Sequence, residues 1–230
     1  MNLAGKILAV TGSNGALGQA VAATLSAYGA RLALIDHAHE PSIVPPAAAL
    51  HYGGTDLTDG DTARAVMQRI VKDSGRLDGL INLAGGFRWE KLVGGTLETW
   101  DAMYRLNLRT AVASCEAALP YLLQAGSGRI VNVGAMGAVK AAAGMGAYAA
   151  SKAGVAQLTQ ALADELKDQG ITVNAILPST LDTPKNRQDM PKADFTRWVT
   201  LSEAAEVIAF LVSNEARAVT GALIPVVGRV

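Results

Sequence analysis

The sequence predicts an α/β fold, a doubly wound parallel sheet of about seven strands with helices on both faces. Short apolar runs without polar alternation recur along the chain, and stretches of helical length separate them. Strands that are apolar on both sides are typical of a parallel sheet that crossover helices cover on both faces. With 230 residues, the chain fits one domain with a large core.

Apolar runs that end in glycine or in an acidic residue mark the first strands. KILAVTG ends in Gly12, ARLALID ends in Asp36, and LDGLINLAGG ends in two glycines. Ligands of doubly wound sheets bind at the carboxyl ends of the strands, so these residues are candidates for a binding site. The predicted strands cover residues 6–12, 30–36, 49–52, 77–86, 128–134, 171–178 and 222–227.

The segments between the strands predict helices. We expect Pro120 to break or end the third helix, and Gly170 to follow the end of the fourth. The glycine-containing residues 85–95 predict a substrate loop, and the polar, proline-containing residues 179–200 predict a loop or lid. The predicted helices cover residues 16–28, 59–74, 96–123, 148–168 and 202–213.

The composition limits the classes of partner. Half of the residues are hydrophobic and 17% are charged, which excludes a disordered chain. The 20 basic residues balance the 20 acidic ones, so nothing in the charge favours nucleic acid or an anionic membrane. No apolar run approaches the ~20 residues that span a bilayer, and strand-like sequence from Lys6 leads us to expect no signal peptide.

Cysteine and histidine indicate the compartment and the absence of a metal site. The single cysteine, Cys115, excludes an internal disulfide and favours a cytoplasmic location. His37, His39 and His51 lie in predicted loops without the spacing of metal ligands, so we expect no metal.

The segment TGSNGALG (11–18) joins the first strand to the first helix and predicts a turn that binds the pyrophosphate of a dinucleotide. Gly12 permits a tight turn, Gly15 allows close approach of the backbone to the pyrophosphate, and Gly18 lets the helix lie close to the sheet. The N–H groups at the start of the helix would bind the phosphates. The alternative is a turn with a purely structural role.

Asp36 lies at the tip of the second strand, where a carboxylate accepts hydrogen bonds from ribose hydroxyls and repels a 2′-phosphate. No arginine or lysine lies in residues 12–18 or directly after Asp36. NAD(H) is therefore favoured over NADP(H), unless Asp36 only caps a turn. Asp56 is a candidate for the adenine amino group, or an ordinary turn residue.

Tyr148 and Lys152 lie four residues apart in a predicted helix and so share one face. An ammonium near a phenol favours the phenolate, so we expect Lys152 to lower the pKa of Tyr148 towards neutrality. Tyr148 would then be a usable proton donor or acceptor. Lys152 would in addition hold the nicotinamide ribose.

Taken together, the motifs resemble those of the short-chain dehydrogenase/reductase family over the whole chain. The resemblance implies a Rossmann fold, and a single dinucleotide-binding and catalytic domain over residues 1–230. It also implies a homodimer or homotetramer. The long helices predicted at 96–123 and 148–168 are rich in small and apolar residues, so they are candidates to pair across a two-fold axis. The matching pieces are TGSNGALG, Asp36, NLAG (82–85), Asn107, IVNV (130–133), YAASK (148–152) and LPSTLDT (177–183).

The resemblance assigns a role to each matching residue. Asn82 to Gly85 would steady the strand end that faces the cofactor, and Asn107 would hold a water that relays protons to Lys152. Pro178 and Thr183 would place the nicotinamide carboxamide. The catalytic set is then Tyr148, Lys152 and Asn107. The expected cofactor contacts are Gly12, Asn14, Gly15, Ala16, Leu17, Gly18, Asp36, Asp56, Leu57, Asn82, Ala84, Gly85, Tyr148, Lys152, Pro178 and Thr183.

Two departures from the family pattern point to one branch. Most members carry a serine at the position of Ala135. Most also carry the middle glycine of the glycine-rich turn at the position of Ala16, whereas this chain has that glycine one residue earlier, at Gly15. Both departures are shared with quinonoid dihydropteridine reductases, to which residues 181–198 are also similar. The resemblance implies NADH-dependent reduction of a small heteroaromatic quinonoid.

Ala135 also bears on the reaction, because the usual serine donates a hydrogen bond to a carbonyl oxygen that becomes an alkoxide. Loss of such a donor costs about 2.7–4 kcal/mol in the transition state. A conjugated carbonyl, imine or quinonoid spreads the incoming electrons and needs this donor less. The alternatives are an ordinary alcohol or ketone substrate, with Ser151, Ser179 or Thr180 as the donor, and a cofactor-binding sensor or scaffold with little turnover.

Aromatic residues of the loop and the lid complete the predicted substrate pocket. Phe87, Trp89, Phe195 and Trp198 are candidates to stack on a flat ring beside Ala135, or are ordinary packing residues. We therefore expect a small-molecule substrate.

Overall fold

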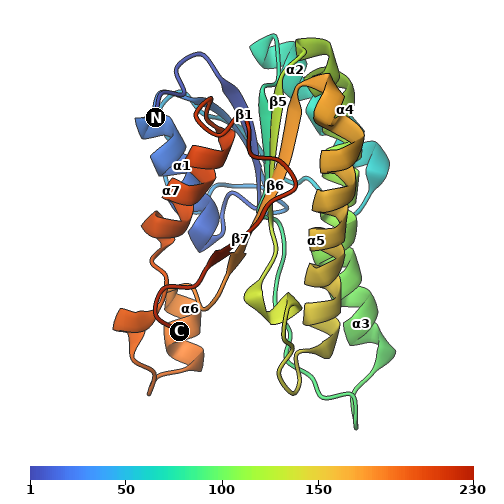
Figure 1. The fold of residues 1–230 in the computed structure, drawn as a ribbon, viewed down its shortest axis with the longest axis vertical. Coiled ribbons are helices and arrows are strands. Elements are labelled where there is room, and N and C mark those ends of the chain that lie inside the picture. The colour runs from blue at the N-terminus through green and yellow to red at the C-terminus, as the bar shows by residue number, and fades with distance from the viewer.

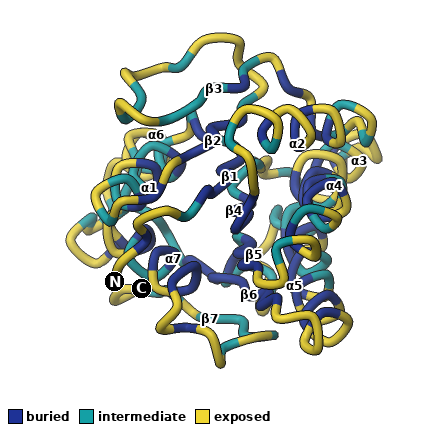
Figure 2. The backbone as a smooth tube through the Cα atoms, turned by 90° about the horizontal axis from the view of Figure 1, so that it is seen from above, coloured by how far each residue is buried: buried dark blue, intermediate teal, exposed yellow.

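The computed structural model describes all 230 residues and contains one parallel sheet of seven strands in the order β3-β2-β1-β4-β5-β6-β7. The predicted fold class is confirmed. The central strands lie in the buried middle of the molecule, and the edge strands β3 and β7 are only partly buried (Figure 2). The strands are β1 (Ile7–Thr11), β2 (Arg31–Ile35), β3 (Leu50–Tyr52), β4 (Gly79–Asn82), β5 (Gly128–Val133), β6 (Ile171–Pro178) and β7 (Leu223–Val226).

Helices cover both faces of the sheet, and each face has its own apolar core (Figure 1). On one face α1 and α7 pack together, with Val21, Leu25 and Ile208 fully buried. On the other face α2, α4 and α5 cover the sheet. The main helices are α1 (Ala16–Ala27), α2 (Gly60–Ser74), α3 (Leu97–Met103), α4 (Thr110–Ala125), α5 (Gly146–Leu166), α6 (Pro184–Asp189) and α7 (Leu201–Val212).

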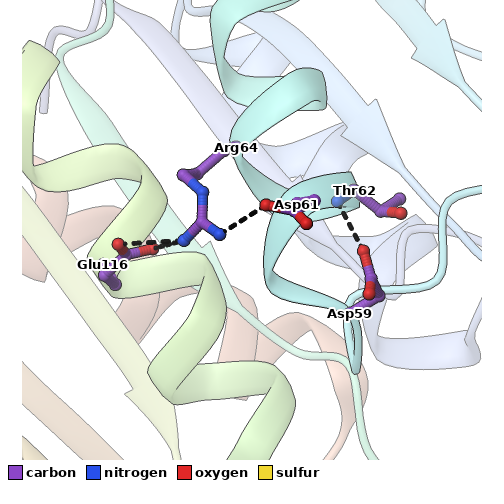
Figure 3. Close-up of polar contacts among 5 residues, drawn as sticks. All are labelled: Asp59, Asp61, Thr62, Arg64 and Glu116. Atoms are coloured by element: carbon purple, nitrogen blue, oxygen red, sulfur yellow. Dashed lines mark hydrogen bonds and ion pairs between the residues drawn. The ribbon is translucent and has the colours of Figure 1, made fainter.

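Polar contacts set the start of α2 and connect it with α4 (Figure 3). The Asp59 carboxylate accepts a 2.7 Å hydrogen bond from the backbone N–H of Thr62, as expected of an N-cap residue. Arg64 bridges Asp61 on its own helix and Glu116 on α4. These ion pairs are exposed, so the buried apolar contacts between the two helices contribute most of the stabilisation.

The helix predicted over residues 96–123 differs from the structure in two ways. It is divided into α3, a π-helical turn over Tyr104–Arg109, and α4. Pro120 neither breaks nor ends α4, which continues to Ala125 because Ala117, Ala118 and Leu122 hold it against the sheet. Tertiary packing here outweighs the loss of one backbone hydrogen bond.

The predicted lid is partly ordered into short helices. Residues 179–200 contain α6 and a 3₁₀ turn over Phe195–Arg197, and a bridge between Leu181 and Val199 closes the segment at its base. α6 lies at the end of the molecule where the loops after the strands emerge (Figure 1). No helix combines the length and the apolar character needed to cross a membrane.

Candidate active site

The glycine-rich turn after β1 forms a cradle with little free space for side chains. Gly12 has φ of +64°, and a Cβ there would lie 2.8 Å from the backbone nitrogen of Ala84. A Cβ on Gly18 would overlap the carbonyl oxygen of Gly12. Helix α1 starts after Gly15 and has no side-chain cap, so its first N–H groups lack a side-chain acceptor. These features fit the pyrophosphate of a dinucleotide.

Thr11 connects this turn to the neighbouring strand end. Its hydroxyl accepts hydrogen bonds of 3.1 Å from the backbone N–H groups of Leu83 and Ala84. This role of Thr11 was not predicted, although a polar residue at the end of an apolar strand indicates such a role.

The carboxylate of Asp36 is oriented by two backbone groups. One oxygen accepts a 2.9 Å bond from the N–H of Asn14, and the other accepts a 3.0 Å bond from the N–H of Ala38. Asp36 is thus a turn-capping residue and still partly exposed beside the glycine-rich turn. The Asn14 side chain extends this arrangement, since it donates to the carbonyl of Glu40 and accepts from the N–H of Ser42.

Asp56 lies in the turn that follows the edge strand β3. It is exposed and accepts a 2.9 Å hydrogen bond from the backbone N–H of Thr58, which lowers the pKa of its carboxyl. This bond is the one expected of an ordinary turn residue, and a contact with adenine stays a prediction. Leu57, beside it, is buried.

A buried chain of amides connects the ends of β4 and β5. Asn82 donates a 2.8 Å hydrogen bond to Asn132, and Asn132 donates a 2.9 Å bond to the hydroxyl of Thr159 on α5. All three side chains are buried. Asn132 and Thr159 were not predicted, although a polar residue inside the apolar run IVNV was again a signal.

Asn107 lies in the π-helical turn and is 1% exposed. Its Oδ1 accepts a 2.8 Å bond from the N–H of Gly86, and its Nδ2 donates to the Gly86 carbonyl at 3.1 Å and to Ser151 Oγ at 3.0 Å. π-Turns are frequent at functional sites. Here the turn directs an amide into the site, where it holds the loop after β4; the proposed water relay stays a prediction.

Lys152 and Tyr148 lie on the first turns of α5, as expected. The Lys152 ammonium is buried and donates a 2.7 Å hydrogen bond to the carbonyl of Val133, and burial lowers its pKa to about 8. The expectation that Lys152 lowers the pKa of Tyr148 is wrong for this structure. Burial of the phenol raises that pKa to about 12, and the ammonium is bound to Val133 instead of offsetting the effect.

Comparison with known proteins identifies the family to which this chain belongs. The family model described as short chain dehydrogenase matches residues 6–194. The chain belongs to this family. A 3-oxoacyl-acyl-carrier-protein reductase of Thermotoga maritima is 34% identical over 99% of this chain and 98% of its own length. A levodione reductase of Leifsonia aquatica is 29% identical over 97% of this chain and 93% of its own.

Solved structures agree with this assignment. The crystal structure of levodione reductase matches with a TM-score of 0.90 and 28% identity, over 99% of this chain and 98% of its own. Carveol dehydrogenase from Mycobacterium avium, crystallised in complex with NAD, matches with a TM-score of 0.87 and 26% identity, over 99% and 98% of the two chains. The chain is therefore an oxidoreductase of the short-chain dehydrogenase family, which uses a nicotinamide cofactor.

Within this short-chain dehydrogenase, Ala135 follows β5 and is 5% exposed. Two of the three hydroxyls considered as replacements for a serine already donate hydrogen bonds. Ser151 donates to the carbonyl of Tyr148 at 2.7 Å, and Ser179 donates to the carbonyl of Val227 at 2.8 Å. Thr180 is partly exposed, and its hydroxyl has no hydrogen-bond partner within the chain.

The residues predicted to place the nicotinamide lie where β6 ends. Pro178 is the last residue of β6, and Thr183 caps α6, where its hydroxyl accepts a 3.1 Å bond from the N–H of Asn186. Both lie at or after the carboxyl-terminal end of a strand, as does Gly85 after β4, and the Lys152 ammonium on α5 bonds the end of β5. A Cβ on Gly85 would lie 3.3 Å from Lys152 Nζ, so Gly85 and Lys152 are direct neighbours.

The aromatic residues of the predicted substrate pocket differ in exposure. Phe87 and Trp89 are each 56% exposed, and Phe87 contacts the ring of Tyr148. Trp198 is only 7% exposed and packs against Phe195 with 4.8 Å between ring centroids. The structure therefore does not offer Trp198 as a stacking surface, because its side chain is buried and packed against Phe195.

Proposed function

We propose that this short-chain dehydrogenase transfers hydride from NADH to a small conjugated carbonyl, imine or quinonoid substrate, in the manner of a dihydropteridine reductase. The observation that supports this proposal is Ala135, a methyl group where the family places a hydroxyl. The nearby hydroxyls of Ser151 and Ser179 are engaged with backbone carbonyls and have no second proton to donate. A substrate that delocalises its developing charge suits such a site.

Some residues of the site bind the cofactor, and others transfer a proton to the substrate. The glycine-rich turn holds the pyrophosphate of the cofactor, and Asp36 holds the adenosine ribose, where its carboxylate disfavours a 2′-phosphate. Bound NADH supplies the hydride. Tyr148 donates one proton to the nitrogen or oxygen of the reduced substrate, which together with the hydride completes a two-electron reduction.

Lys152 supports this transfer through its position. Its ammonium, at the end of β5, is one helical turn from Tyr148 and next to Gly85. A raised pKa keeps Tyr148 protonated before the reaction, as a proton donor requires. A cation near the phenol then stabilises the phenolate that remains after the proton has left.

A second candidate function is the reduction of an ordinary ketone. The relatives named as 3-oxoacyl-acyl-carrier-protein reductase and levodione reductase favour it. In that case the free hydroxyl of Thr180 is the candidate donor to the carbonyl oxygen.

The test is the rate of NADH oxidation with three substrates, a quinonoid dihydropterin, a quinone and a simple ketone. We expect turnover of the first two and little of the third. Tyr148→Phe should abolish most of this turnover and leave NADH affinity nearly unchanged, because the phenol acts on the substrate. Efficient reduction of the ketone alone, lost in Thr180→Val, would establish the second candidate instead.

We also propose a homodimer or homotetramer. α3, the π-turn and α4 expose apolar side chains, and water disfavours a large apolar face of this kind. The exposed residues are Leu97, Trp100, Tyr104, Leu106, Val112 and Leu123. Sedimentation of the free protein measures the mass of the assembly.

A further inference from the structure

The phenol ring of Tyr148 is held by packing, since its hydroxyl has no hydrogen-bond partner within the chain. The ring of Phe87 meets it edge to face, with 5.0 Å between centroids and an angle of 84° between the planes. On another side lies Gly137, where a Cβ would come within 3.8 Å of the Tyr148 ring and 2.9 Å of the Met145 side chain. Edge-to-face geometry of this kind is attractive between aromatic rings.

The backbone at Phe87 is fixed by hydrogen bonds of the preceding residue, Gly86. The N–H and the carbonyl of Gly86 both bond to the buried amide of Asn107, at 2.8 and 3.1 Å. Two hydrogen bonds to one planar amide fix the peptide groups on both sides of Gly86. The Asn107 amide thereby sets the direction in which the chain enters Phe87.

The residues after Phe87 are fixed to the segment that precedes α5. Trp89 Nε1 donates a 3.0 Å bond to the carbonyl of Ala143, and the N–H of Glu90 donates a 2.9 Å bond to the carbonyl of Gly144. The Glu90 carboxylate accepts bonds from the N–H of Thr96 and the hydroxyl of Thr99. The segment 86–90 is thus a brace between Asn107 and the start of the helix that carries Tyr148.

We infer that Phe87 is a positioning residue, which holds the Tyr148 phenol in the orientation for proton transfer where Ala135 supplies no hydroxyl to do so. Phe87 is 56% exposed and belongs to neither apolar core, so the fold does not require it. The inference rests on the proposed role of Tyr148 as proton donor. It does not depend on which carbonyl or imine is the substrate.

Two roles of Phe87 predict different kinetics. A residue that only lines the pocket contributes to substrate binding, so its loss raises KM. A residue that orients the proton donor affects the reacting geometry, so its loss lowers kcat, and a misplacement of about 1 Å costs on the order of 100-fold. The ionisation of Tyr148 is a third readout, because removal of the Phe87 ring admits water to the phenol.

The experiment compares Phe87→Ala and Phe87→Leu with Val44→Ala, a control outside the substrate loop at a side chain that is 91% exposed. We expect Phe87→Ala to lower kcat about 10- to 100-fold while KM changes little. Phe87→Leu should lie between Phe87→Ala and the unmodified protein, and Val44→Ala should match the unmodified protein. NADH binding, measured by fluorescence, should be the same in all four proteins.

An ultraviolet titration of tyrosinate in the protein without substrate gives the spectroscopic readout. The Tyr148→Phe variant identifies the contribution of Tyr148 by difference. In Phe87→Ala the pKa of Tyr148 should fall from about 12 towards the ordinary value of 10.0, and in Val44→Ala it should not move. An unchanged titration together with an unchanged kcat, or a rise in KM alone, would overturn the inference.

Failure of the proposed function gives a different pattern. If the protein reduces only simple ketones, the substrate assignment fails, but Phe87→Ala still lowers kcat on the ketone and still shifts the Tyr148 titration. If Tyr148→Phe retains full turnover, the proton-donor role fails and the positioning role fails with it.

Discussion

The ammonium of Lys152 on α5 donates a 2.7 Å hydrogen bond to the carbonyl of Val133, the last residue of β5. The lysine is 6% exposed, and no carboxylate is paired with it in the structure. A cation buried against a single carbonyl is costly, because one neutral acceptor replaces only part of its hydration. Lys152 is thus held in this position at the expense of folding stability.

Lys152→Met should therefore stabilise the fold although it impairs the reaction. We expect the free energy of unfolding at pH 7 to rise by about 1–3 kcal/mol. This is the cost of burying the ammonium that the lowered pKa of Lys152 implies, reduced by the loss of its hydrogen bond to Val133. Denaturant unfolding measures it. The exposed Lys167→Met is the control and should change little, and an equally large change there would contradict the prediction.

The advantage of Lys152→Met should depend on pH. Below about pH 8, Lys152 is protonated in both the folded and the unfolded chain, so the cost of burying it is constant. Between about 8 and 10.5 the folded chain loses this proton first, so the unfolded chain binds more protons and stability rises with pH. Unfolding curves at about pH 7 and 9.5 should show the advantage shrinking at the higher pH.

Gly18→Ala should disrupt the dinucleotide cradle, because its Cβ would overlap the carbonyl oxygen of Gly12. Backbone atoms cannot move aside as a side chain does, so we expect a loss of about 1–3 kcal/mol in stability. NADH affinity should fall at least tenfold. Gly60→Ala is the control, since a Cβ there meets only the Arg64 side chain at 3.5 Å. Normal NADH binding by Gly18→Ala would contradict the assigned role of the turn.

Asp36→Ala should narrow the preference for NADH over NADPH. The carboxylate held by the N–H groups of Asn14 and Ala38 is the charge that a 2′-phosphate would meet. Its removal should improve NADPH binding relative to NADH about tenfold, measured by fluorescence titration of both cofactors. Asp36→Asn, which removes the charge but keeps one acceptor oxygen, separates repulsion from turn capping. If the unmodified protein binds NADPH as tightly as NADH, the assignment is wrong.

Ala135→Ser should restore a donor aimed at a developing oxyanion. A well-aligned donor contributes up to about 2.7–4 kcal/mol to a reaction that builds an alkoxide. Turnover of a simple ketone should rise from a low baseline, while reduction of a quinonoid should change little. The measurement is kcat/KM on both substrates, with Ala138→Ser in the same segment as the control. Efficient ketone turnover that Ala135→Ser leaves unchanged would show that another hydroxyl acts.

The sequence alone determined the features that depend on short-range rules. Uninterrupted apolar runs and their spacing predicted the seven strands, because a strand buried on both faces needs apolar residues at every position. The glycines of residues 11–18 predicted a tight turn before a helix, because only a residue without Cβ fits there. The spacing of Tyr148 and Lys152 likewise places them on one helix face.

Other features of the site depend on contacts between residues that are distant in the sequence, and only the tertiary structure shows these contacts. Asn107 forms hydrogen bonds with Gly86, Lys152 donates to the carbonyl of Val133, and Pro120 is tolerated inside a packed helix. The pKa of Tyr148 also rises where the sequence predicted a fall. Burial and hydrogen-bond partners of this kind arise only when folding brings distant segments together. The periodicity and spacing of residues within one segment therefore cannot predict them.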